Sequence, residues 1–161
     1  ATQSREELPY YEHKEVGYNY RMSPINAAVG LSEWSDIEIK LKERKIIFDQ
    51  YRDALQSTPG FQFPEERKLA SSNHWFTTIL IDHNHAVNHK GSRELMEKLA
   101  RCGIEARLMW NPMHRQPAFK QYRSYLNGVS DQLFECGLCL PSDRNALHQQ
   151  AEIISAICSG L

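Results

Sequence analysis

Several features that define common classes of protein are missing from this sequence. No apolar run approaches the roughly 20 residues that span a bilayer, and the mean hydropathy is −0.58. The net charge of −1 leaves no basic excess for nucleic acid. There is no glycine-rich phosphate loop and no persuasive serine, histidine and acid set. Since no signal-peptide pattern opens the chain either, we expect a cytoplasmic protein without membrane or nucleic-acid partners.

Metal ligands are also sparse. The four cysteines include one C-x-x-C pair, Cys136 and Cys139. Gly137 is typical of a helix stop and Cys139 lies in an apolar run, so the pair is interpreted as structural. His83, His85 and His89 have a spacing unlike common zinc patterns. The sequence therefore predicts no metal site and a reduced protein.

Periodicity predicts an α/β sandwich, a small sheet with helices packed on it. Ser23 and Pro24 are a favourable helix start. From there one long helix is expected to extend to Thr58-Pro59-Gly60, where the chain turns. The apolar stripe of this helix consists of Ile37, Leu41, Phe48, Tyr51 and Leu55. Strands are expected at 61–63, 75–81, 104–110 and 138–140, and further helices at 92–101, 130–136 and from about 147 to 158.

Four segments then resemble one enzyme family, the DegT/DnrJ/EryC1 sugar aminotransferases. The first segment, residues 15–34, contains Gly-Tyr-Asn-Tyr-Arg-Met; the others are 72–79, 104–117 and 133–142. The closest resemblance is to the branch that aminates C4 of UDP-4-keto-6-deoxy-N-acetylglucosamine, on the route to bacillosamine-type sugars. Asn111, Arg115 and Asn26 depart from that pattern, replacing lysine, leucine and glutamine. A GDP- or dTDP-linked keto sugar is therefore an alternative substrate.

The resemblance implies a fold and a division of the chain. The fold would be the small C-terminal domain of an aspartate-aminotransferase-like (fold type I) enzyme, a mostly antiparallel sheet with packed helices preceded by a long helix. Residues 1–57 would form an interface and cofactor-contact segment with the linking helix, and residues 58–161 the small domain. The large domain with the lysine that binds pyridoxal phosphate would lie outside this chain, because Lys14 lacks the surrounding motif. No catalytic residue is then expected here, and the chain alone should be inactive.

Cofactor contacts are implied at Asn19 and Arg21. In the family pattern Asn19 would donate to the phosphate of pyridoxal phosphate bound by the partner subunit of a homodimer with a shared active site. By residue type alone, the favoured interpretation is that Asn19 forms a turn after Gly17; the resemblance reverses that order. Arg21 could bind a phosphate or make an interface ion pair.

Substrate contacts are expected from the residues around the predicted strand ends. Arg107, Trp110 and His114 combine a guanidinium, an indole and an imidazole, which suit diphosphate, base or sugar, and hydroxyl groups. His74 is a further candidate. Tyr18 and Tyr20 flank Asn19 and would either contact sugar or pack. The alternative for the Trp110 region is that Trp110 and Met113 are core residues and His114 is a structural histidine.

Two functional hypotheses follow. In the first, the chain is part of an enzyme that transfers an amino group, expected to come from glutamate, to a nucleotide-linked keto sugar for surface glycans or glycoproteins. In the second, it is a cofactor-free binding or regulatory module derived from such an enzyme. An apolar patch along Ile25, Val29 and Trp34 is expected to promote self-association.

Overall fold

The computed structural model describes residues 20–65, 69–82 and 91–159. The chain divides into two compact units, Ala1–Glu38 and Ile39–Leu161. The predicted boundary between residues 57 and 58 stays a prediction; the nearest helix end is Leu55, and the buried side chains of that helix belong to the second unit. Among the described residues, no helix is long and apolar enough to cross a membrane.

The first unit contains helix α1, Pro24–Trp34. Its start is as predicted, since the Ser23 hydroxyl accepts a hydrogen bond from the amide of Asn26 at 3.2 Å and Pro24 occupies the first turn. No residue of α1 is buried. Its exposed apolar side chains include Ile25, Val29, Leu31 and Trp34. The three residues of the expected apolar patch, Ile25, Val29 and Trp34, are therefore all exposed.

The expected single long helix was wrong, because the helical path is interrupted between Trp34 and Ile37. Helix α2 spans Ile37–Leu55. At the interruption the Ser35 hydroxyl donates to the carbonyl of Ser32 at 2.9 Å, and the amide of Asp36 donates to the carbonyl of Glu33 at 3.3 Å. Serine and aspartate offer the backbone such local alternatives to helical hydrogen bonds, which explains the break.

The second unit is built on an antiparallel sheet with strand order β1-β2-β4-β3. Its strands are β1 (Phe61–Gln62), β2 (Thr77–Ile81), β3 (Arg107–Leu108) and β4 (Gly137–Leu140). Ile79 pairs with Leu138, so both point to one face, whereas Thr78 and Cys139 pair on the other. The register thus gives the sheet a helix-covered face and a second face, which we call the open face.

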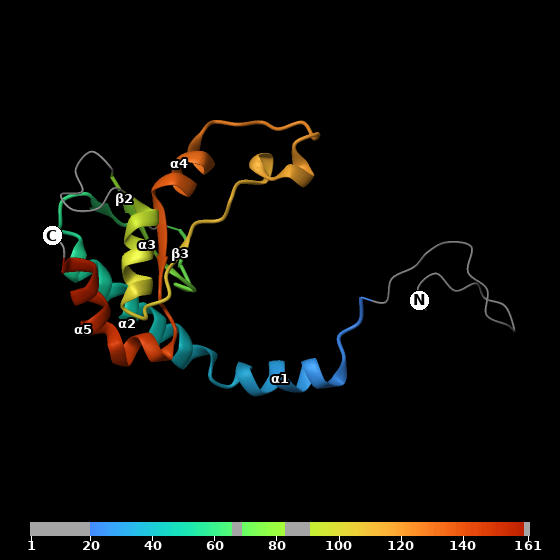
Figure 1. Cartoon of the computed structure of the whole chain (residues 1–161). Helices are drawn as coiled ribbons and strands as arrows, with labels where there is room; N and C mark the ends of the chain where they lie inside the picture. The colour runs from blue at the N-terminus through green and yellow to red at the C-terminus, as the bar shows by residue number, and fades with distance from the viewer. Residues whose placement is uncertain (1–19, 66–68, 83–90, 160–161) are drawn as a thin grey trace, which may run out of the picture. The chain divides into compact units, whose positions relative to one another are not determined.

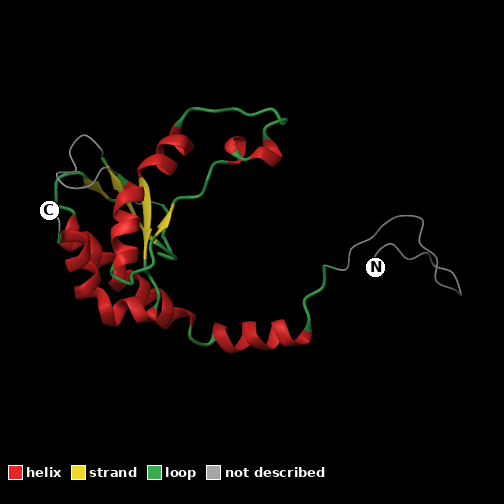
Figure 2. Cartoon of the chain, viewed as in Figure 1, coloured by secondary structure: helices red, strands yellow, loops and turns green. Residues whose placement is uncertain are grey.

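Helices α2, α3 (Ser92–Arg101) and α5 (Arg144–Cys158) pack on the first face (Figure 1). They enclose one apolar core with the strands, formed by Ile47, Tyr51, Leu55, Phe61, Ile79, Ile81, Leu95, Leu99, Ala106, Leu138, Leu140, Ala146, Ile153 and Ile157. The strands form one layer and these helices the other, as the colouring in Figure 2 shows. The predicted α/β class with a small antiparallel sheet and packed helices is confirmed.

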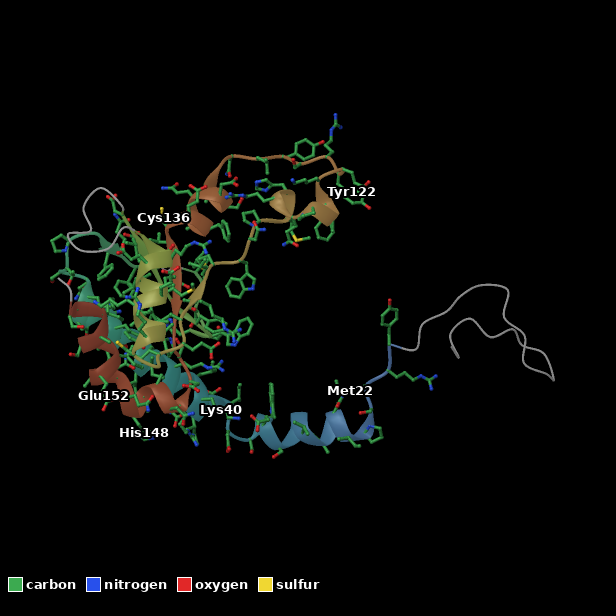
Figure 3. The ribbon with its side chains drawn as sticks, in the orientation of Figure 1. Met22, Lys40, Tyr122, Cys136, His148 and Glu152 are labelled. Atoms are coloured by element: carbon green, nitrogen blue, oxygen red, sulfur yellow. The ribbon has the colours of Figure 1, made fainter. Side chains whose placement is uncertain are left out.

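Between β3 and β4 the chain makes a long excursion, residues 110–128, which we call the arm. The arm contains two short 3-10 turns, η2 (Met113–Arg115) and η3 (Pro117–Phe119), and leads into α4 (Val129–Cys136). Figure 3 shows Tyr122 at the outer end of the arm and Cys136 at the end of α4. The strand expected at 104–110 is reduced to two residues, because β3 pairs with β4 only at Arg107 and Leu108 before the chain departs.

Candidate functional site

A pocket of about 380 Å³ lies at the β3 edge of the second unit. Arg107 of β3, Trp75 just before β2 and Arg44 of α2 contribute to its lining. Asn145 and Gln149 from the start of α5 line it as well. The pocket therefore combines two guanidinium groups, an indole and two amides with the carboxylates of Glu105 and Asp143. Its arginines can bind an anionic group and its amides a hydroxyl-bearing one.

Arg107 is positioned by strand pairing. It lies opposite Cys139, which places it on the open face of the sheet. Its Nη2 donates to Glu105 Oε1 at 2.6 Å, and its side chain is 70% exposed. An exposed ion pair of this kind contributes little to stability. Little free energy is therefore lost when the Arg107 guanidinium leaves Glu105 and binds an anionic group of a ligand instead.

Trp110 belongs to an aromatic cluster at the mouth of this pocket. Its ring centroid lies 6.2 Å from that of Trp75 and 5.9 Å from that of Phe76. Trp75 and Phe76 are themselves 4.8 Å apart. Trp110 is 61% exposed and Trp75 is 57% exposed. Trp110 is therefore not a core residue, and its open ring surface can take a planar or sugar group.

His114 lies at the base of the arm and contacts α4. Its Nε2 is 3.0 Å from Asp131 Oδ1. Arg115 Nη1 is 3.6 Å from the same carboxylate oxygen and 3.3 Å from Glu135 Oε1, with its guanidinium over the Phe134 ring. The cluster of His114, Arg115, Asp131 and Glu135 fixes the first turn of the arm to the helix.

His74 is placed differently from the other candidates. It is 7% exposed, and its ring stacks on Phe48 of α2 with centroids 4.3 Å apart. Its φ of +46° is uncommon for a residue other than glycine. Its amide donates to the hydroxyl of Ser72 at 3.0 Å. The pocket that His74 lines, of about 360 Å³, does not include Arg107 or Trp110.

Cys139 lines the first pocket but is a poor nucleophile. Burial raises the pKa of its thiol, which lies 3.8 Å from the Thr78 hydroxyl and 3.6 Å from the Met109 sulfur. The thiol therefore stays protonated near neutral pH. Cys136 and Cys139 are both free thiols. Across the described ranges, no three His, Cys, Asp or Glu side chains are grouped as a metal site would need.

The remaining candidates belong to the start of the chain. Tyr20 and Arg21 lie in the loop before α1, where Tyr20 has a φ of +46°, and both are exposed. Tyr18 and Asn19 lie outside the described residues, as do Lys14, His83, His85 and His89. The structure thus brings together Arg107 and Trp110, holds His114 on the adjoining arm, and separates His74 from them.

Sequence reasoning missed Arg44, Asn145 and Gln149. Each lies far along the chain from Arg107, and helical periodicity marks such residues merely as polar and solvent-facing. Asp131 was missed as well. It lies 17 residues from His114 along the chain, and only the packing of the arm on α4 brings the two side chains together.

Comparison with known proteins decides the family. Residues 2–158 match the DegT/DnrJ/EryC1/StrS aminotransferase family. The chain belongs to this family. It is 35% identical over 162 residues to EpsN of Bacillus subtilis (strain 168), whose name gives it as a candidate pyridoxal phosphate-dependent aminotransferase. The match covers 98% of this chain and 40% of EpsN.

Two further relatives support the assignment. The chain is 34% identical over 130 residues to the dTDP-4-amino-4,6-dideoxy-D-glucose transaminase of Escherichia coli, covering 78% of this chain and 34% of that enzyme. A solved DegT DnrJ EryC1 StrS aminotransferase from Brucella abortus superposes with a TM-score of 0.77 at 25% identity, covering 97% of this chain and 40% of that structure. The chain thus spans about two fifths or less of the length of these relatives.

Proposed function

We propose that this chain is the C-terminal part of a pyridoxal phosphate-dependent aminotransferase that acts on a nucleotide-linked 4-keto-6-deoxy sugar. The amino group of glutamate would move to C4 of the sugar, and glutamate would leave as 2-oxoglutarate. The observation that carries the proposal is the family match over residues 2–158. The product would serve surface glycan or glycoprotein synthesis.

The nucleotide is the least constrained part of the substrate. The E. coli relative is named for a dTDP-linked 4-amino sugar, whereas the motifs of residues 104–117 resemble a UDP-dependent branch. Asn111 and Arg115, the two departures from that branch, both lie on the arm. We therefore propose the keto-sugar chemistry without assigning the base.

The described residues can be compared with the needs of pyridoxal phosphate. The cofactor needs a lysine, an acid for its ring nitrogen and donors for its phosphate. Arg21 is an exposed cation in the loop before α1 and suits a phosphate oxygen. Among the described lysines, Lys45 is paired with Asp49 at 2.8 Å and Lys98 reaches the carbonyl of Ile157 at 3.5 Å. Arg21 therefore fits a phosphate contact, and we propose that the lysine attachment lies outside this chain.

Bound at the active site, pyridoxal phosphate would supply the electron sink for amino transfer. This chain would supply positioning. Arg21, with Asn19, would hold the phosphate across a homodimer interface, and Tyr18 and Tyr20 would flank that contact. The exposed apolar face of α1 would be covered in the same dimer.

On the substrate side, Arg107 would bind diphosphate oxygens and Trp110 would stack on the base or sugar. The exposed Arg107 side chain and the open Trp110 ring support these roles. His114 would contact a hydroxyl or N–H group from the arm. For His74 we propose a supporting role and no direct substrate contact. Its ring is buried against Phe48 and can hold the segment that leads into β2.

The test is turnover by the protein produced from the complete reading frame. UDP-, GDP- and dTDP-linked 4-keto-6-deoxy sugars are each supplied with glutamate, and the amino sugar and 2-oxoglutarate are quantified by mass spectrometry. We expect amination of one of them, with a higher KM in Arg107→Gln and an unchanged KM in Arg101→Gln, an exposed arginine of α3. Absence of amination with all three, together with nucleotide-sugar binding in the absence of cofactor, would favour a binding module instead.

A further inference from the structure

The base of the arm contains a contact that the family match does not explain. His114 and Asp131 are 17 residues apart, yet the imidazole Nε2 lies 3.0 Å from Asp131 Oδ1. The His114 side chain is 18% exposed and that of Asp131 is 32% exposed. A hydrogen bond of this ordinary length, between side chains that are mostly shielded from solvent, orients the ring.

The chemistry of the pair fixes which nitrogen carries the proton. An ionised carboxylate accepts hydrogen bonds and has no proton to donate. His114 must therefore donate through Nε2–H, and in the neutral ring Nδ1 then holds the lone pair. Nδ1 has no hydrogen-bond partner within residues 20–65, 69–82 and 91–159. It is left as an acceptor on the arm.

Arg115 keeps the carboxylate in place. Its Nη1 lies 3.6 Å from Asp131 Oδ1 and 3.3 Å from Glu135 Oε1, while its guanidinium covers the Phe134 ring at 5.1 Å. Asp131 is in the first turn of α4, so its backbone is fixed by the helix. The carboxylate is thus held between a cation and an imidazole, and rotation away from His114 would break both contacts.

We propose that Asp131 is a positioning residue that holds His114 in the Nε2–H tautomer, with Nδ1 presented to a hydroxyl or N–H group of the nucleotide-linked sugar. The substrate part of this inference rests on the proposed function, whereas the tautomer does not. Arg115, a departure from the related branch, acquires a role as the support of Asp131. The pair therefore affects how well the substrate binds more than how fast it reacts.

The tautomer is tested by nitrogen NMR of the full-length protein labelled with ¹⁵N-histidine at about pH 8, where an ordinary imidazole is neutral. His114→Asn identifies the His114 signals. We expect a protonated Nε2 and an unprotonated Nδ1. Asp131→Asn should place the proton on Nδ1 in part of the population, because its amide can donate to Nε2 as well as accept from it, whereas Glu135→Gln should leave the pattern unchanged. A doubly protonated ring or a proton on Nδ1 in the parent protein would overturn the assignment.

Kinetics test the substrate part. Loss of one hydrogen bond predicts about a tenfold rise in the KM of the nucleotide sugar in Asp131→Asn, with kcat and the KM of glutamate unchanged. In a His114→Ala background the same change should have no further effect, since the two residues act as one unit. Equal effects of Asp131→Asn in both backgrounds would refute the positioning role. An Nε2–H tautomer in a protein that aminates no keto sugar would sink the proposed function and leave the tautomer standing.

Discussion

Gly137 offers the sharpest stability test of the fold. It lies between α4 and β4 with φ −87° and ψ 142°, a backbone conformation that alanine adopts without strain. Backbone entropy alone would then make Gly137→Ala stabilising by about 0.4–1 kcal/mol. The surroundings oppose this, because an added Cβ would overlap the Met109 side chain and lie 2.5 Å from the Leu133 carbonyl oxygen.

Overpacking of this kind costs about 1–3 kcal/mol, so we expect Gly137→Ala to lower the free energy of unfolding by about 1–2 kcal/mol after the entropic gain. Urea unfolding followed by circular dichroism measures it. Met109→Ala should relieve part of the cost and not all of it, since the Leu133 carbonyl is backbone. The control is Gly30→Ala, where an added Cβ meets no atom within 4 Å. A Gly137→Ala protein as stable as the parent would refute the packing at the β4 start.

Three further outcomes are expected. Tyr51→Phe should lower the free energy of unfolding by about 1 kcal/mol, measured by urea unfolding, because the Tyr51 hydroxyl donates to the Pro141 carbonyl at 3.1 Å; an unchanged midpoint would contradict the bond. Under native conditions a thiol reagent should label exposed Cys102 well before Cys139, because burial shields the Cys139 thiol and raises its pKa. Mass spectrometry measures the two rates, and equal rates would contradict the burial of Cys139. Asp143→Ala should cost about 1 kcal/mol, since its carboxylate caps the first turn of α5, whereas Asp143→Asn, which keeps the cap, should cost less.

The regular elements of the second unit could be predicted from local pattern. Ser92–Arg101 has an apolar stripe ended by Cys102-Gly103, and the structure gives that helix the same bounds. The interruption at Ser35 and Asp36 was not predictable from periodicity, because the apolar stripe continues past it in α2. Gly137 was identified as a helix stop, but its decisive property is the absence of a Cβ beside Met109 and not a left-handed backbone.

The candidate site was predictable in part. Arg107 and Trp110 could be named because they end a strand in a familiar motif, and the structure places both near one pocket. Arg44 could not be named, since its approach to that pocket depends on how α2 packs on the sheet. Asn19 and Tyr18 stay predictions, since they lie outside the described residues.

The central claim, that this chain is the rear part of a pyridoxal phosphate enzyme, is tested most directly by the visible absorbance of the protein purified from its complete reading frame. We predict a yellow protein that loses its colour on borohydride treatment, with the reduced cofactor found by peptide mass spectrometry on a lysine outside these 161 residues. A colourless protein, or a cofactor attached to a lysine within this chain, would contradict the account.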